Sequence, residues 1–240
     1  MTVIEPQVEW KEIADDTEEE TGIYQQPNWK GELGALVPSE NDQPLEAKLE
    51  STDLEVNDLT GLIVPFGEEY KTPMKLGRSF NIEPQDQITV KAKQDSGAAK
   101  EVGVALLISQ NVGESVTSKP SGKQLTYVRE TGTPTAAEEF SEAISIEPSD
   151  FKDLKSAKDY VIVKAYVLGA NALFSRLRTE GFDRRAWFVP TAENKSELGS
   201  FDYGDLFKNY PIINTSSTVY LDVFMSATGE VTLWLELLER

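Results

Sequence analysis

The chain has 240 residues, of which 39% are hydrophobic and 27% charged, and its formal net charge is −18. It contains neither cysteine nor histidine, which excludes disulfides, thiolate or imidazole zinc ligands, cysteine nucleophiles and Ser-His-Asp triads. So acidic a surface repels phosphate backbones, and we expect no direct nucleic-acid binding. No apolar stretch approaches 18 residues and no secretory signal is visible, so we predict neither a transmembrane helix nor a signal peptide.

Residues 1–44 show no regular periodicity. Five acidic residues fall between positions 15 and 20, and proline and glycine interrupt the segment from 21 to 44. We therefore expect an irregular N-terminal arm, whose removal over the first twenty residues spares folding and impairs assembly. Trp10 and Trp29 would anchor this arm, either on its own domain or on a neighbouring subunit. They are for that reason candidate subunit-interface residues.

From Leu45 onward, apolar and polar residues alternate in short segments separated by turn-forming residues. This alternation is typical of strands packed on one face. The segments lie at 45–56, 59–66, 87–94, 101–109, 123–130, 140–147, 159–169 and 184–189. Residues 219–225 and 231–237 are predicted to pair as a closing hairpin, joined by a turn at 227–229.

The number of strands predicts an all-β fold, an antiparallel jelly-roll sandwich over residues 45–240. Two segments have helical spacing and predict short helices. One spans 149–160 after an N-cap at Ser149 or Asp150, and the other spans 169–181 and ends at Gly181. A change of composition near 131–137 leaves open a second β unit stacked on the first.

Arginines form the one local reversal of charge. Four of them lie within ten residues, at Arg176, Arg178, Arg184 and Arg185. Arginine pairs bidentately with carboxylates and is enriched at interfaces. The cluster therefore predicts either a head-to-tail contact with an acidic patch on an identical subunit or salt bridges within the chain.

Two further kinds of site are compatible with the sequence. Trp187, Tyr203, Phe207 and Tyr210 could form an aromatic platform for a sugar, or else be core and loop anchors. Asp202, Asp205, Glu193 and Glu197 could hold a hard cation, although loop carboxylates in so acidic a chain are usually solvated. We expect no catalytic residues, no metal and no cofactor. A carbohydrate-binding module and a carboxylate-dependent glycoside hydrolase stay as alternative functions.

The stretches "LIVPFGEEYKTPMKLGRSFNIEPQDQITVKAK" and "STVYLDVFMSATGEVTLWLELLER" resemble the jelly-roll major capsid proteins of membrane-containing icosahedral viruses of archaea and bacteria. The resemblance, over residues 45–240, implies a single jelly roll, with a second β unit in some members. It implies a structural virion protein, made in the host cytoplasm, that assembles with itself and other capsid proteins. It also allows proximity to an internal membrane without insertion.

The last strand supports assembly independently of the resemblance. Its apolar residues fall on alternate positions and predict a buried face. Trp234 and Leu238 lie on the opposite parity, on a face that is only partly polar. Such a face suits a subunit contact better than open water.

Overall fold

The computed structural model of the chain describes residues 3–39, 46–51, 61–66, 73–110, 115–116, 118–180, 186–193, 203 and 209–240. These residues form two compact units. One comprises Pro6–Gln110, and the other comprises Asn111–Arg240 together with Met1–Glu5. No helix in the described ranges is long and apolar enough to cross a membrane.

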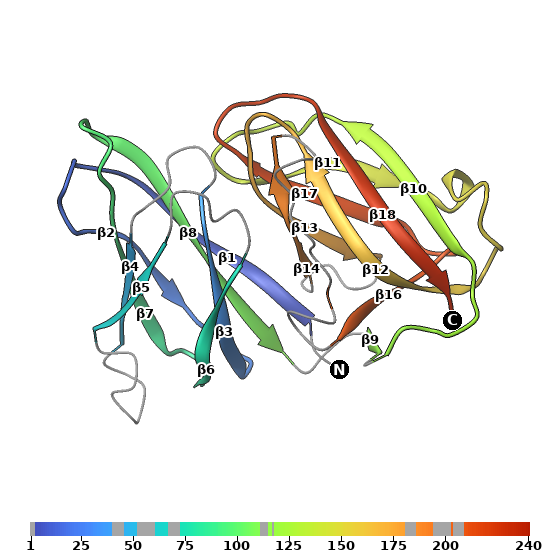
Figure 1. Cartoon of the computed structure of the whole chain (residues 1–240), viewed down its shortest axis with the longest axis horizontal. Helices are drawn as coiled ribbons and strands as arrows, with labels where there is room; N and C mark the ends of the chain where they lie inside the picture. Colours follow the sequence, from blue (N-terminus) through green and yellow to red (C-terminus); the bar gives the residue numbers. More distant parts are fainter. Residues whose placement is uncertain are drawn as a thin grey trace. The chain divides into compact units, whose positions relative to one another are not determined.

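The first unit contains two antiparallel sheets of four strands each (Figure 1). One sheet has the order β1-β8-β3-β6 and the other the order β2-β7-β4-β5. The strands are β1 (Val3–Ile13), β2 (Glu19–Gln25), β3 (Gly31–Pro38), β4 (Glu46–Glu50), β5 (Leu62–Pro65), β6 (Met74–Ile82), β7 (Gln87–Lys93) and β8 (Lys100–Gln110).

The second unit repeats this organisation. Its sheets have the orders β10-β18-β12-β16 and β11-β17-β13-β14. Two short strands, β9 (Ser115–Val116) and β15 (Thr191–Ala192), are added beside β16 and β12. The main strands are β10 (Leu125–Gly132), β11 (Phe140–Ile146), β12 (Asp159–Leu168), β13 (Ala172–Thr179), β14 (Ala186–Val189), β16 (Tyr210–Asn214), β17 (Val219–Met225) and β18 (Val231–Glu239).

Both units are complete jelly rolls. If the eight main strands of each are counted in chain order, each unit has one sheet ordered 1-8-3-6 and one ordered 2-7-4-5, the arrangement produced by two interleaved Greek keys. The all-β jelly-roll sandwich predicted from the sequence is therefore confirmed. Of the two arrangements left open, one β unit or two, the chain has two jelly rolls, and the division falls after Gln110 rather than near 131–137.

Each jelly roll has its own apolar core. In the first, aliphatic residues of β3, β7 and β8 pack around Leu36, Val90 and Leu106, all fully buried. In the second, β12, β17 and β18 contribute residues such as Leu221 and Leu235, also fully buried. Alternate positions point inward along these strands, as strand geometry requires. Because each unit has its own core, residues pack mainly against other residues of the same unit.

The expected irregular arm is wrong. Residues 3–13, 19–25 and 31–38 form β1, β2 and β3 of the first jelly roll. Ile13 and Tyr24 are buried in its core, at 1% and 5% exposure. The acidic and turn-forming residues that suggested an arm lie at strand ends and on outward faces, where charge is tolerated. Removal of the first twenty residues would therefore delete β1 and disrupt folding of this unit.

The two expected helices are also wrong. Residues 148–150 form a single 3₁₀ turn, in which the Asp150 carboxylate accepts a hydrogen bond from the Glu147 backbone N–H at 2.9 Å. Residues 172–179 form β13. Positions i and i+2 share a face only in a strand, and Arg176 and Arg178 both reach Asp222. The availability of β17 as a pairing partner outweighs helical spacing here.

The closing hairpin is wrong as well. β17 pairs with β11 and β13, whereas β18 pairs with β10 and β12 in the facing sheet. Alternation alone does not distinguish the two cases, because a buried face is required either way. The five residues between the two strands are enough to cross the roughly 10 Å that separates packed sheets. The apolar faces of β17 and β18 thus point toward one another across the core.

Candidate functional site

The outward face of the β10–β18–β12 sheet is the main candidate surface. In this sheet Arg129 of β10 lies opposite Trp234 of β18, which in turn lies opposite Tyr166 of β12. The intervening residues Val128, Leu235 and Ala165 point into the core. The alternation that builds the core therefore places these three polar-aromatic side chains side by side on the outside.

These side chains form a continuous stack. The Tyr166 and Trp234 rings are 6.2 Å apart and inclined by 20°, and the Arg129 guanidinium lies 5.3 Å from the Trp234 ring centre. Trp234 is thus held between a cation on one strand and a ring on the other. Such contacts contribute about 0.5–1.5 kcal/mol each beyond burial. They fix the rings before any partner arrives.

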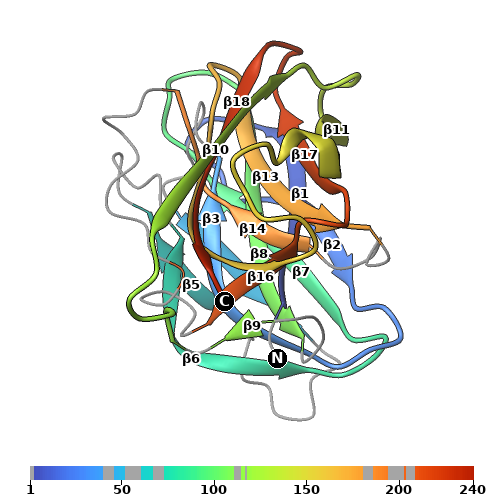
Figure 2. The same cartoon turned by 90° about the vertical axis from the view of Figure 1, so that its right-hand side faces the viewer.

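Two exposed apolar residues extend the stack along β10. Leu125 is 37% exposed and Tyr127 57% exposed. They share the outward parity of Arg129, and β10 is the outermost strand of this sheet (Figure 2). We call Leu125, Tyr127, Arg129, Tyr166 and Trp234 the aromatic face. Trp, Tyr and Arg are the residue types that dominate binding energy at protein interfaces.

A pocket of about 320 Å³ adjoins the aromatic face. It lies between β10 and the turn after β11, and its walls combine an aromatic ring with charges of both signs. The lining residues are Tyr127, Val128, Arg129, Glu130 and the segment 150–154. The pocket thus combines apolar and charged groups beside the aromatic face.

Electrostatics distinguish Arg129 from its neighbours. Lys164 pairs with Glu236 at 3.8 Å, Lys155 with Glu239 at 2.6 Å, and the Arg240 guanidinium with Asp159 at 3.9 Å. Arg129 forms no ion pair with any described residue. Partial burial raises the pKa of the Tyr166 hydroxyl above its ordinary value, with the Glu236 charge adding to the effect. Within the part of the chain that the structure describes, this face therefore presents a cation without an ion-pair partner beside aromatic rings.

The predicted arginine cluster is engaged within the chain where it is described. The Arg178 guanidinium donates to both oxygens of Asp222, at 2.6 and 2.7 Å, and Arg176 donates to the same carboxylate at 2.9 Å. Asp222 is 3% exposed. Arg176 also lies 4.4 Å from the Phe140 ring centre. Intramolecular pairing, one of the two alternatives, thus holds for Arg176 and Arg178, while Arg184 and Arg185 lie outside the described residues.

The two candidate tryptophans of the N-terminal region lie on strands or turns of the first jelly roll. Trp29 is partly buried against its core, and the Trp29 carbonyl accepts a hydrogen bond from the Gln26 side chain at 2.7 Å. Trp10 lies on β1 and is half-buried. Packing on its own unit is what the structure shows for Trp29. An interface role for Trp10 and Trp29 stays a prediction.

The aromatic sugar platform does not form as predicted. Trp187, Tyr203 and Tyr210 are 7%, 0% and 8% exposed, so none offers an open ring face. The Tyr203 hydroxyl donates to the Phe188 carbonyl at 2.8 Å, and burial raises its pKa far above the ordinary value. Phe207 lies outside the described residues. These rings are core, as the alternative interpretation held.

The candidate cation site falls largely outside the described residues, since Asp202, Asp205 and Glu197 are not described. Within the described ranges, no three carboxylates are grouped so as to hold a metal ion. Glu193 is described and exposed. The expectation that these carboxylates are solvated and hold no metal stays a prediction.

The sequence indicates part of the aromatic face. The opposite parity of Trp234 marks it as a contact surface, but Tyr127 and Arg129 are recognisable from the sequence only as strand residues. Their role becomes visible from the pairing of β10 with β18, which brings residues more than a hundred positions apart onto one face. In residues 159–168 the outward-facing positions are partly apolar and partly polar, and this mixture is the sequence signal for Tyr166.

No family model matches the chain, and no curated protein matches it. Among solved structures, the chain is similar to the major capsid protein P2 of bacteriophage PM2, at 13% identity and a TM-score of 0.28. That match covers 100% of this chain and 97% of the other. It is also similar to an archaeal virus protein described by its triple jelly roll fold and turret assembly, at 8% identity and a TM-score of 0.25.

A third similar structure comes from Sulfolobus turreted icosahedral virus, at 8% identity and a TM-score of 0.24. In these two viral structures the match covers 96% of this chain and 59% of the other chain. The present chain therefore spans about three fifths of their length. The jelly-roll assignment itself rests on the strand orders of the two units.

Proposed function

We propose that this protein is a structural, self-assembling virion protein, a major capsid subunit of an icosahedral shell. The observation that carries the proposal is the combination of two complete jelly rolls with an outward sheet face of interface composition. In this function the protein acts through the surfaces that bind other subunits and not through a catalysed reaction. We assign it no catalytic residue and no cofactor.

The aromatic face supports assembly on energetic grounds. Leu125 and Tyr127 leave apolar area in water, and covering such area contributes about 25 cal/mol per Å². The stacked Arg129, Trp234 and Tyr166 are already ordered by cross-strand contacts, so binding loses little side-chain entropy. A pre-ordered aromatic face with exposed apolar area is therefore suited to a specific protein contact.

A sugar ligand is a poorer match to the same face. Sugars stack on open aromatic ring faces, and both faces of Trp234 are flanked, by Arg129 and by Tyr166. Tyr127 offers an exposed ring, but a single ring is a weak platform. We therefore place the partners of this protein among copies of itself and other capsid proteins, within the virion.

Light scattering and negative-stain microscopy of the purified full chain test this proposal. We expect large, regular particles or capsomers whose proportion rises with protein concentration. The acidic surface makes assembly salt-dependent, since screening reduces repulsion between like charges. A protein that stays monomeric at high concentration across low, physiological and high salt would contradict the proposal.

A further inference from the structure

We propose that the aromatic face docks on the outer face of the β2–β7–β4–β5 sheet of a second copy. The second jelly roll of one copy would thereby bind the first jelly roll of the next. This inference rests on the self-assembly proposed above and specifies which surfaces meet. Here Arg129, and not the arginine cluster, supplies the positive charge of the head-to-tail contact. The described members of that cluster, Arg176 and Arg178, pair within the chain.

The distribution of exposed apolar side chains selects these two faces. Four large hydrophobic residues are exposed in the part of the chain that the structure describes. Leu125 and Tyr127 belong to the aromatic face. Ile23 of β2 and Ile63 of β5, at 52% and 53% exposure, lie on the two outer strands of the β2–β7–β4–β5 sheet. Each face thus has apolar area that a partner would cover.

Register shows that Ile23 shares its face with an acidic residue. Ile23 lies opposite Thr89, and Glu20 lies opposite Lys91, on the outward parity of β7. Glu20 is exposed and pairs with no cation among the described residues. Lys91 and Lys48 instead bind Glu50, at 2.9 and 3.0 Å. The centre of this sheet is internally neutralised, whereas Glu20 at its β2 end has no ion-pair partner among the described residues.

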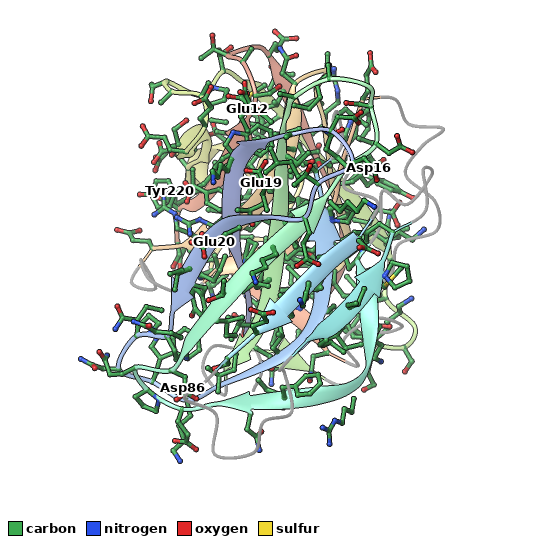
Figure 3. The ribbon with its side chains drawn as sticks, turned by 90° about the vertical axis from the view of Figure 1, so that its left-hand side faces the viewer. Glu12, Asp16, Glu19, Glu20, Asp86 and Tyr220 are labelled. Carbon is green, nitrogen blue, oxygen red and sulfur yellow. The ribbon has the colours of Figure 1, made fainter. Side chains whose placement is uncertain are left out.

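The acidity extends around the start of β2. Residues 9–20 contain seven acidic residues, several of which are paired within the unit. Lys93 binds Asp16 at 2.6 Å, Lys48 binds Glu18 at 3.3 Å, and Lys11 lies 4.0 Å from Glu19. Glu12 and Glu20 are exposed and form no ion pair with any described residue. Figure 3 shows Glu12, Asp16, Glu19 and Glu20 on this side of the first jelly roll. The aromatic face offers Arg129, a cation without a described ion-pair partner. Opposite charges surrounding two apolar patches favour one relative orientation and disfavour contact between like faces.

The contact joins two different surfaces, so it is heterologous. Such a contact closes into a ring when its rotation divides a full turn, and otherwise continues as an open chain. A half-turn rotation closes the ring at two copies, and smaller rotations give larger rings. The number of copies is therefore a property to be measured, and the surfaces are what this inference specifies.

A charge swap in the full chain tests the contact. Sedimentation velocity over a concentration series would compare the unmodified protein with Arg129→Glu, with Tyr127→Ala and with the double variant Arg129→Glu/Glu20→Lys. We expect Tyr127→Ala and Arg129→Glu each to weaken association by about tenfold or more. The double variant should recover most of that loss, since the opposite charges are exchanged.

Arg78→Glu is the matched control. Like Arg129, Arg78 is exposed and stacks on an aromatic ring, with its guanidinium 5.0 Å from the Phe80 ring centre. Its replacement by Glu changes the net charge by the same amount. It belongs to neither face, so association should match that of the unmodified chain. Circular dichroism of each variant verifies that folding is retained.

The outcomes separate this inference from the proposed function. If the unmodified chain assembles and neither Tyr127→Ala nor Arg129→Glu weakens it, the aromatic face is not the contact, and the capsid proposal stands. If Arg129→Glu weakens assembly and Glu20→Lys fails to restore it, the docking partner named here is wrong. If the unmodified chain never associates, the proposed function fails first.

Discussion

The two jelly rolls share one strand order and differ in what they present to solvent. Residues 6–110 contain 21 acidic and nine basic residues, a formal charge of −12, whereas the remaining residues contain 20 and 14, a charge of −6. The outward β10–β18–β12 face carries stacked aromatic side chains beside the Lys164–Glu236 pair, and the outward β2–β7–β4–β5 face carries ion pairs and two isoleucines. The cores of both units are apolar, with aliphatic and aromatic side chains.

This difference shows how one architecture separates folding from recognition. Strand alternation assigns every second residue to the core, where volume and apolarity are what matter. The outward-facing residues of each strand are not subject to this packing constraint. Two units with the same topology can therefore diverge outward and become complementary to one another.

Deletion of residues 233–240 should produce the largest difference in stability between the two jelly rolls. These residues form most of β18, which lies between β10 and β12. We expect the second jelly roll to unfold while the first keeps its own core and a separate transition. Limited proteolysis followed by mass spectrometry should leave a resistant fragment covering the first unit. Loss of protection over both units would show that the rolls do not fold separately.

A smaller effect is expected from Asp222→Ala, which leaves two guanidiniums without their shared acceptor. Removing one partner of a buried pair costs about 3–5 kcal/mol, and we expect roughly 2–4 because both arginines keep some solvent contact. Urea unfolding monitored on the second jelly roll measures this. Glu142→Ala, which removes only a 3.7 Å contact to Arg178, is the control and should change stability little.

The first jelly roll should show its own pH dependence through Glu9. The Glu9 carboxyl lies over Gly22, where a Cβ would overlap it, and burial raises the pKa of Glu9. Folding then favours the protonated form, so stability is full at low pH and falls as pH rises through the folded-state pKa.

Glu9→Gln should flatten that dependence and raise the thermal midpoint of the first roll near neutral pH. The exposed Glu12→Gln serves as the control. A lower midpoint for Glu9→Gln than for the unmodified chain at neutral pH would contradict the burial argument.

The smallest effect concerns the surface pair Lys155–Glu239 in the second roll. A hydrogen bond from Lys155 holds the pKa of Glu239 below its ordinary value. Lys155→Met should let that pKa rise, with little change in stability because the pair is solvated. Carboxyl titration by NMR detects the shift. An unchanged Glu239 titration would mean that the pair does not persist in solution.

The fold class was predictable because the signal is local. Alternation in segments such as 101–109 and 231–237 correctly indicated strands, and turn residues separated them. Pairing was not predictable, because a strand with one buried face fits a hairpin or a crossing between sheets equally well. β17 and β18 show this most clearly, because they were predicted to pair as a hairpin and instead lie in different sheets. The strands of residues 3–38 were missed because their outward charges masked the inward alternation of Ile13, Tyr24 and Leu33.

The candidate surface was predictable only in fragments. The parity of Trp234 indicated a contact face, since a tryptophan opposite a buried leucine row must point outward. Arg129 and Tyr166 required the β10–β18–β12 register. The arginine cluster showed the converse, because a sequence does not reveal that Asp222 lies directly across from Arg176. Long-range pairing decides which charges remain available.

The chain contains no cysteine, so cross-linking through introduced cysteines tests directly whether the aromatic face docks on the β2–β7–β4–β5 sheet of a second copy. Copies carrying Tyr127→Cys would be mixed with copies carrying Ile23→Cys and treated with a short thiol-to-thiol reagent. If the two faces dock, covalent dimers should form between the two kinds of copy, in clear excess over a mixture of Tyr127→Cys with Arg78→Cys. Equal yields from the two mixtures, under conditions where the unmodified protein assembles, would contradict it.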